Sequence, residues 1–590
     1  MEYSYQRNEA IIHSKTREFF GVGAVVTAST YLVLVVDFML IGWILGADAV
    51  AAAGLCDSFV DIAEFPGFVI SSGGPIAASI LLGKRQYRNA NGVFTLSFLL
   101  TLAGGLLCCC LLPFCNLFGA LLAGGENVIA GEAARYTFFV LASSPFVGLN
   151  LVLSSYAILD NHSKLAMGQV IAANAVNLVM DIVLMKFTHM GVAGASAASL
   201  LGNLAGIVVG LPYLLSKRRT FRFNLCVREL WETCRSLVSS STSFAVDKVS
   251  RIVAGLIINV LLMYYIGSTG VVLYAVYGRL KFILRILAGG ALQTISTLGS
   301  MLYGERDFFG IREMLSLLFK YTYVIVAVVV AGLFLFSAAF LRSYGIDPYE
   351  PGTHTIFAFR LMLLGLPFLW LNELLARFYP SIQRQNLSVL LLALQNVVWK
   401  ISILLLCVLA VVQWGVDGLP AVALWCFLVE LLALTVTLLW EKIRYKQIAI
   451  FSMKDRGDLD CHTFSITGAP ESVADIHTEI DHFCQQNRIP RNKGNLLAIA
   501  FEEAALNIIN HSSHVDTIDI FLLLENNNLI VRIRDNGPPF DPLTYEDETD
   551  ILQRNNIKLL EKLADKKEYT RIMNMNNTVL SIRLQEQGAV

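Results

Sequence analysis

The sequence is poor in charge. Only 15% of its 590 residues are Asp, Glu, Lys or Arg, against roughly 25% in soluble domains, whereas 55% are hydrophobic. The formal net charge of −1 gives no sign of a nucleic-acid partner. Paired C-x-x-C motifs and Cys/His metal spacings are absent, and most of the eleven cysteines lie inside apolar runs. These shortages exclude a disulfide framework and an ordinary soluble fold for most of the chain.

Long apolar stretches follow one another from about residue 18 to residue 440. Each is long enough for a helix of about 20 residues to cross a bilayer, and at this length only helices satisfy their own backbone hydrogen bonds in lipid. We therefore predict an all-α membrane bundle. Its twelve predicted transmembrane helices are 18–45, 50–82, 91–118, 134–158, 165–187, 191–216, 240–266, 270–300, 314–341, 355–378, 386–412 and 416–440.

Short motifs recur in the membrane part at a nearly constant offset of 221 to 224 residues. The pairs are PFVGLN at 145–150 with PFLWLN at 367–372, GVAG at 191–194 with GVDG at 415–418, and Gly83-Lys84 with Gly304-Glu305. Three matches at nearly one offset predict two six-helix halves, and an even number of helices per half makes the repeats parallel. Paired halves are typical of an alternating-access carrier.

Positive charge in the loops predicts the orientation. Lys and Arg gather in every second connection: Lys84, Arg85 and Arg88; Lys164; Lys217, Arg218, Arg219 and Arg222; Arg306 and Arg312; Arg384; Lys442, Arg444 and Lys446. By the positive-inside rule we expect a multi-pass protein of the cytoplasmic membrane with both termini in the cytoplasm. The predicted domains are an N-terminal segment 1–17, a first half 18–216, a loop 217–239, a second half 240–440, a linker 441–460 and a soluble domain 461–590.

Ionisable and amide side chains interrupt two of these spans. Asp37 lies midway along the first span, and the fifth carries Asn174, Asn177 and Asp181. Spacings of three and four put the latter three on one helical face. Since a charge at bilayer depth costs about 2.5–3.5 kcal/mol, each suggests function. Oxygen ligands suit a small cation, and a carboxylate shielded from water can equally carry a proton. The alternative is a polar network that only joins helices.

An acidic stripe marks the second span. Asp57, Asp61 and Glu64 are spaced by four and three residues and so share one face. If this face lines a cavity, it favours cationic substrates. If it lies at a helix end near the outer surface, the acids are simply solvated, and both interpretations stay open. In the seventh span Asp247 and Arg251 are four residues apart, so we expect them to pair.

After residue 440 the sequence reads as a soluble α/β domain. HTFSITG, DIFLLL, LIVRIRD and VLSIRL are typical of strands, and ESVADIHTEIDHFCQQN and NKGNLLAIAFEEAALNIINHSS of amphipathic helices. We expect a layer of helices on a mixed sheet.

Two motifs in this domain suggest a nucleotide site. FEEAALNIINH places Glu503, Asn507 and His511 on one helical face. An Asn there can complete Mg²⁺ coordination, and the Glu can activate an attacking hydroxyl. In RDNGPPFDP, Asp535 can accept a hydrogen bond from an adenine amino group, and Gly537 lets the backbone approach the base.

The membrane part resembles the MATE (multidrug and toxin extrusion) transporters, which are cation-coupled exporters. The resemblance covers about residues 19–440 and is most specific at 36–55, 144–184 and 191–198. It implies two six-helix bundles in which entry of Na⁺ or H⁺ drives substrate exit. In many MATE proteins an acid of the first helix and an Asn-x3-Asp set of the fifth form a cation site, which here falls on Asp37, Asn177 and Asp181.

The C-terminal part, about residues 462–584, resembles the GHKL ATPase fold, and most nearly its anti-sigma-factor serine kinases. This resemblance implies ATP and Mg²⁺ as ligands. The family's glycine-rich lid corresponds here to ILQRNNIKLLEKLAD at 551–565, which contains no glycine. Binding without rapid hydrolysis, or a degenerate module that only contacts protein, therefore stay open.

The first functional hypothesis is a Na⁺- or H⁺-coupled exporter of small organic cations, lodged in membrane lipid. Its tail would sense nucleotide or phosphorylate a cytoplasmic protein partner. A second is a membrane-anchored serine kinase or anti-sigma switch whose transporter-like part senses a ligand. A third is an exporter of a lipid-linked or anionic metabolite, which should place Arg or Lys in the cavity. The tail has no G-x4-GK[ST] run, so ATP is not expected to drive transport.

Overall fold

A computed structural model describes most of the chain. The described residues are 9–46, 49, 53, 56–122, 127–188, 190–217, 219–224, 229–266, 268–343, 348–349, 354–450, 461–511, 515–525, 528–542 and 564–584. They fall into two compact units. One is Thr16–Met453, called here the membrane unit, and the other combines Lys454–Val590, called here the tail, with Met1–Lys15.

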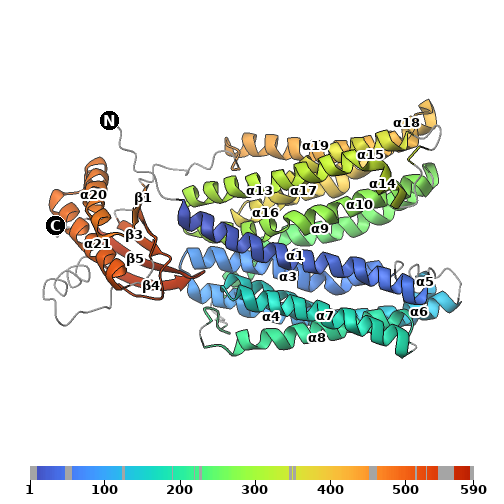
Figure 1. Ribbon diagram of the computed structural model, residues 1–590, viewed down its shortest axis with the longest axis horizontal. Coiled ribbons are helices and arrows are strands. Elements are labelled where there is room, and N and C mark those ends of the chain that lie inside the picture. Colours follow the sequence, from blue (N-terminus) through green and yellow to red (C-terminus); the bar gives the residue numbers. More distant parts are fainter. Residues whose placement is uncertain are drawn as a thin grey trace. The chain divides into compact units, whose positions relative to one another are not determined.

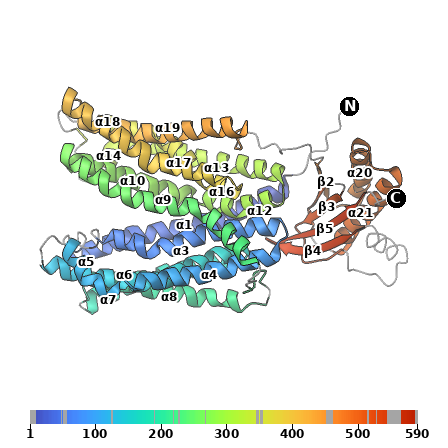
Figure 2. The same ribbon diagram turned by 180° about the vertical axis from the view of Figure 1, so that it is seen from behind.

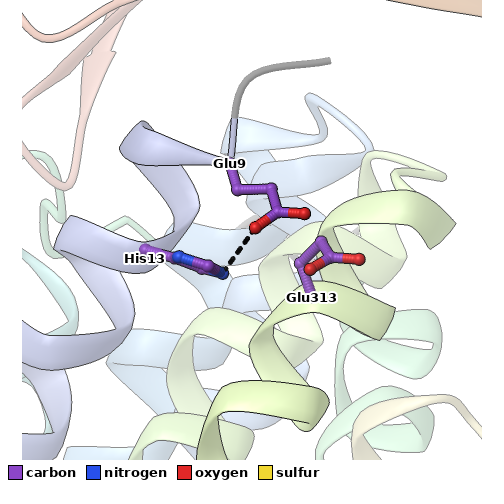
Figure 3. A group of neighbouring side chains, drawn as sticks. All are labelled: Glu9, His13 and Glu313. Carbon is purple, nitrogen blue, oxygen red and sulfur yellow. Dashed lines mark ion pairs between the residues drawn. The ribbon is translucent and has the colours of Figure 1, made fainter. Parts of the chain in front are cut away.

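The membrane unit is helical throughout its described length, as predicted. The first half contains α1 (Ala10–Leu45), α3 (Asp57–Gly83), α4 (Tyr87–Cys109), α5 (Cys115–Leu122), α6 (Asn127–Leu159), α7 (Ser163–Phe187) and α8 (Val192–Leu215). The second half contains α9 (Leu230–Tyr265), α10 (Ser268–Ala288), α11 (Gly290–Thr294), α12 (Ser300–Gly304), α13 (Phe308–Leu335), α14 (Ser337–Ser343), α15 (Thr355–Leu364), α16 (Leu366–Ser381), α17 (Gln385–Ala393), α18 (Trp399–Trp414) and α19 (Gly418–Tyr445). At the start of α1, His13 Nε2 forms an ion pair at 3.4 Å with Glu9 Oε2, one helical turn earlier in the chain (Figure 3).

Ten helices in the described part of the chain are long and apolar enough to cross a membrane. The pair Val276–Ala288 and Gly290–Gly304, bent by 61°, is an eleventh candidate. The remaining predicted span, 240–266, is the seventh along the chain and coincides with α9, a 36-residue helix that carries Asp247, Lys248 and Arg251. The prediction of an all-α polytopic bundle is confirmed.

The two halves meet through equivalent residues. In both views α3 to α8 lie together on one side of the bundle and α9 to α19 on the other (Figures 1 and 2). A Cβ on Gly83 would collide with the carbonyl oxygen of Met301, and a Cβ on Gly304 with that of Ile80. Met301 follows Ile80 by the same 221 residues that separate the two glycines. Such a reciprocal contact is what a two-fold axis between repeats produces.

The tail is a five-stranded sheet covered on one face by helices. Its elements are β1 (Cys461–Thr467), α20 (Ala474–Gln486), α21 (Arg491–His511), β2 (Thr517–Glu525), β3 (Asn528–Asp535), β4 (Lys566–Ile572) and β5 (Met575–Arg583). The strand order is β1-β2-β3-β5-β4. Every pairing is antiparallel, so the prediction of a mixed sheet is wrong.

The tail has a hydrophobic core of its own. Alternate residues of β2, such as Ile518, Ile520 and Leu522, point to the same buried cluster as Phe483 of α20 and Phe501 of α21. This period of two is the expected pattern for a sheet with one covered face. The α/β character predicted for this domain is thus confirmed.

We predict that Gly67→Ala destabilises the membrane unit. A Cβ at Gly67 on α3 would collide with the Cα atom of Gly148 on α6. In lipid, helices associate through such close packing, and overpacking costs about 1–3 kcal/mol. The apparent melting temperature of the detergent-purified protein should therefore fall by several degrees. The matched control is Gly168→Ala on α7, where nothing lies within 4 Å, and equal melting of both variants would contradict the prediction.

Candidate functional site

Two carboxylates meet between α1 and α7 in the first half. Asp37 and Asp181 lie beside each other and interact directly. Asp181 is fully buried, and neither of its oxygens accepts a hydrogen bond with normal geometry from a residue that the structure describes. With its amide oriented to satisfy both neighbours, Asn177 donates to Asp37 Oδ1 at 3.2 Å and accepts from Ser199 Oγ at 3.1 Å. Two acids and an amide thus form one polar site at this helix contact.

Asn174, the fourth residue predicted for this site, points to a different partner. Its Nδ2 donates to Ser29 Oγ of α1 at 2.7 Å. The side chain therefore joins the same two helices without contacting the acids in any described interaction. The structure brings together three of the four predicted residues, Asp37, Asn177 and Asp181.

This arrangement constrains the charge of the two acids. Adjacent carboxylates in a low-dielectric interior cannot both stay ionised without a compensating positive charge. A shared proton or a bound cation would remove the repulsion, and the oxygens available are of the type that hard cations prefer. The site can therefore hold either one, and its two acids titrate as a pair.

The acidic stripe of α3 meets a lysine that sequence analysis missed. Lys248 of α9 forms ion pairs with Asp61 and, at 3.3 Å, with Glu64 Oε2. The side chain of Asp57 lies outside the described residues. Although Asp61 and Glu64 are 43% and 37% exposed, they do not form an unpaired acidic surface. Lys248 is adjacent in sequence to Asp247 of the predicted Asp247–Arg251 pair. A third charge in the same span could have indicated that Lys248 has a partner on another helix.

The predicted pair in α9 is confirmed. Arg251 Nη2 lies 2.9 Å from Asp247 Oδ2. Asn396, in the short π-helical turn Leu394–Val398 between α17 and α18, donates to the other oxygen of Asp247 at 3.1 Å. This acid is therefore satisfied on both oxygens.

A buried carboxylate network in the second half was also missed. Glu430 of α19 is 1% exposed and accepts hydrogen bonds from Tyr277 (3.0 Å), Asn372 (3.0 Å) and Gln395 (2.6 Å). Lys281 of α10 lies 3.5 Å from it. The sequence could have indicated this network, because Glu430 is a lone acid within the apolar run of α19, as Asp37 is in α1. Unlike Asp181, Glu430 is fully satisfied by protein donors.

In the tail, Asp535 lies at the end of β3 and is 2% exposed. Its Oδ1 accepts from the Gly537 N–H and from Asn576 Nδ2, both at 2.8 Å. Burial raises the pKa of the Asp535 carboxyl, while these two hydrogen bonds and the charge of Arg571 act in the opposite direction. Oδ2 accepts no hydrogen bond from a described residue and stays available for a base amino group, which fits an adenine ligand.

The turn after β3 is fixed by residues that sequence analysis did not single out. Arg571 of β4 donates from Nη1 to the Gly537 carbonyl (2.9 Å) and to Asn576 Oδ1 (2.7 Å). Tyr569 donates to the same Asn576 oxygen at 2.8 Å. These partners come from β4 and β5, so only the strand pairing brings them to the turn. The sequence held no local signal for them.

The helix motif of the tail lies on α21. Asn507 is fully buried there, and Glu503 is partly exposed. The side chain of His511, and residues 551–563 of the expected lid, lie outside the described residues. The role of Asn507 as a Mg²⁺ ligand and the binding of the phosphates by the lid therefore remain predictions.

Comparison with known families matches both parts. Residues 24–183 match the MatE family model, and residues 466–584 match the model of the histidine kinase-like ATPase domain. The chain joins a MatE domain to a histidine kinase-like ATPase domain. It is thus a multi-pass membrane protein with an ATPase-like tail, as the resemblances implied.

Relatives and solved structures agree with the MatE domain. The chain is 23% identical over 252 residues to the multidrug export protein MepA of Staphylococcus haemolyticus, which is 42% of this chain and 54% of that protein. A Staphylococcus aureus MepA is 22% identical over 251 residues, with the same coverage. The chain thus spans about half the length of the curated relatives it matches.

A MOP superfamily transporter from Pyrococcus furiosus aligns with a TM-score of 0.63, at 19% identity, over 74% of this chain and 96% of its own. A MATE structure in complex with MaD3S aligns with a TM-score of 0.65, at 20% identity, over 73% and 96%. At these identities the structures show the fold alone.

We predict that the ATPase-like domain, expressed as residues 460–590, folds alone and binds ATP·Mg²⁺ weakly. Isothermal titration should show Asp535→Ala lowering the affinity at least tenfold, because a hydrogen bond to a charged group contributes about 1.5–3 kcal/mol. Glu503→Ala should keep binding and stop any ATP turnover. The control is Glu471→Ala, an exposed acid. No heat at millimolar ATP from a fragment that circular dichroism shows to be folded would contradict nucleotide binding.

Proposed function

We propose that this protein exports small organic compounds in exchange for Na⁺ or H⁺, which enters through Asp37, Asn177 and Asp181. The observation that carries the proposal is the adjacent pair of acids, in which Asp181 has both oxygens buried and without a hydrogen bond of normal geometry from a described residue. A purely structural network would satisfy these oxygens with protein donors, as the network around Glu430 does.

Occupancy of this site changes the contact between α1 and α7. With a proton or cation bound, Asp37 and Asp181 attract a common charge and hold the two helices together. Without it, the like charges repel and favour separation. An ion that binds one arrangement better shifts the population toward it, and the substrate shifts it back if it prefers the other. Exchange of ion for substrate follows from these opposed preferences.

Names of relatives are consistent with export. The matched Staphylococcus proteins are described as multidrug export proteins, and one structural neighbour as an outward-facing multidrug resistance transporter of the MATE family. Both halves of the fold and the repeat are present in this chain. Export of small organic compounds is the function that these similarities support.

Loop charges support a cytoplasmic location for both termini, by the positive-inside rule. The ATPase-like tail would then lie where ATP is present. Asp535 and Gly537 would hold the base, Asn507 and His511 would lie toward the phosphates with Asn507 on Mg²⁺, and Glu503 would act as a general base. We propose that this tail regulates the carrier or phosphorylates a cytoplasmic protein partner.

We predict that Asp37→Asn abolishes ion-coupled export and leaves the protein folded and inserted. The amide keeps the size of the side chain and its contact with Asn177, but it has no negative charge to compensate a cation and no proton to release. Initial efflux rates of a panel of cationic and anionic dyes, in buffers with and without Na⁺ and at two pH values, measure the effect. Wild-type rates at normal expression would rule out a coupling role for this acid.

Asp181→Asn should give a similar loss if both acids share one ion. A clearly milder loss would assign Asp181 a secondary role. Glu232→Gln, an exposed acid at the start of α9, is the matched acid-to-amide control and should export at the wild-type rate.

A further inference from the structure

Two cations in the spans of the second half have no acidic partner. Arg377 lies on α16 and Lys400 on α18. Neither side chain makes an ion pair or a hydrogen bond with any residue in the described ranges. Arg377 lies over the ring of Phe244, which is one turn of α9 from Asp247. Lys400 follows by four residues Asn396, which donates to Asp247 at 3.1 Å, so both cations belong to one region of the bundle.

Four neighbouring cations are matched by acids. The pairs are Lys248 with Asp61 and Glu64, Arg251 with Asp247, Lys281 with Glu430, and Arg285 with Glu373. Asp247 and Glu430 are further satisfied by amide donors, so they cannot supply a second full partner to Arg377 or Lys400. Arg377 and Lys400 are therefore left without a carboxylate of their own among the described residues.

Aromatic rings lie beside both charged groups. The Arg377 guanidinium carbon is 4.5 Å from the centroid of the Phe244 ring. Lys400 Nζ is 5.6 Å from the Tyr274 ring, which packs on Trp425 at a centroid distance of 5.2 Å. Such contacts are worth about 0.5–2 kcal/mol. This is less than the cost of about 2.5–3.5 kcal/mol for one cation at the centre of a membrane helix.

Charged side chains in membrane spans face the bundle interior or water, since lipid does not solvate them. Arg377 and Lys400 are partly exposed on the protein. Partly exposed cations among aromatic faces are suited to an organic anion, whose acidic group supplies the missing charge and whose planar part covers the rings.

We propose that Arg377 and Lys400 form a binding site for a small organic anion, with Phe244, Tyr274 and Trp425 as its apolar wall. That this anion is the exported substrate rests on the function proposed above. The expectation of a cationic substrate came from the acidic stripe of α3, but Lys248 pairs with two acids of that stripe and cancels one of their charges. Asp37 and Asp181, the adjacent acids described in the first half, are assigned to the coupling ion.

Two dyes with the same xanthene ring system and opposite charge test the proposal. Fluorescein is an anion at neutral pH and rhodamine 123 is a cation. Fluorescence polarisation with the purified full-length protein should give a Kd for fluorescein at least tenfold below that for rhodamine 123. Tighter binding of rhodamine 123, or no binding of fluorescein, would overturn the proposal without any variant.

Variants then locate the site. Arg377→Gln and Lys400→Gln should each weaken fluorescein binding at least fivefold and change rhodamine 123 binding less than twofold. Lys400→Arg, which keeps the charge, should retain most of the wild-type affinity for fluorescein. Arg279→Gln is the matched control, because Arg279 is an exposed cation of α10 that also lies over a ring, that of Phe282 at 5.9 Å. Unchanged fluorescein binding in both Gln variants would place the anion elsewhere and refute the assignment.

Transport separates the two proposals. Asp37→Asn should keep fluorescein binding and lose fluorescein export. Binding of fluorescein without export by the wild-type protein would leave the anion site standing and count against the exporter function. Export of rhodamine 123 without binding of fluorescein would do the reverse.

Discussion

A charge placed inside a membrane bundle must be compensated by another group, and the polar interior of this protein follows from that requirement. Glu430 is compensated by three donors and a lysine, and Asp247 by an arginine and an amide. Because several acids and cations in the described spans are matched in this way, the exceptions carry information. The carboxylate pair in the first half lacks a positive charge, and the cations in the second half lack a negative one. The two halves are thus complementary in the kind of ligand that each one still needs.

In the tail, the buried charge of Asp535 is also compensated, but in a different way. Asp535 is nearly as buried as Asp181, but one of its oxygens is held by a backbone N–H and an amide from the neighbouring strand. The carboxylate is therefore fixed in direction before any ligand arrives, and its second oxygen is left as a single acceptor. Fixed direction suits recognition of a neutral amino group, whereas the uncompensated pair in the membrane suits an ion that comes and goes.

Much of the fold was readable from the sequence, and part of the site was not. Apolar run length predicted the helices, and a spacing of four placed Asn177 and Asp181 on one face, because both depend on local geometry alone. The partners of these faces depend on how helices pack, so Lys248, Glu430 and the direction of Asn174 were not foreseen. The direction of the tail strands was mispredicted for a related reason, since alternation of apolar residues is the same in parallel and antiparallel strands.

The reciprocal contact of Gly83 with Gly304 has a mechanical consequence. Residues related by a two-fold axis can touch their own equivalents only at the axis, so this contact must slide or part when one half rotates against the other. Backbone touching backbone there, with no side chains between, leaves little to repack during such a rotation. The two glycines therefore allow the halves to slide or part at the axis with no side chains between them to rearrange.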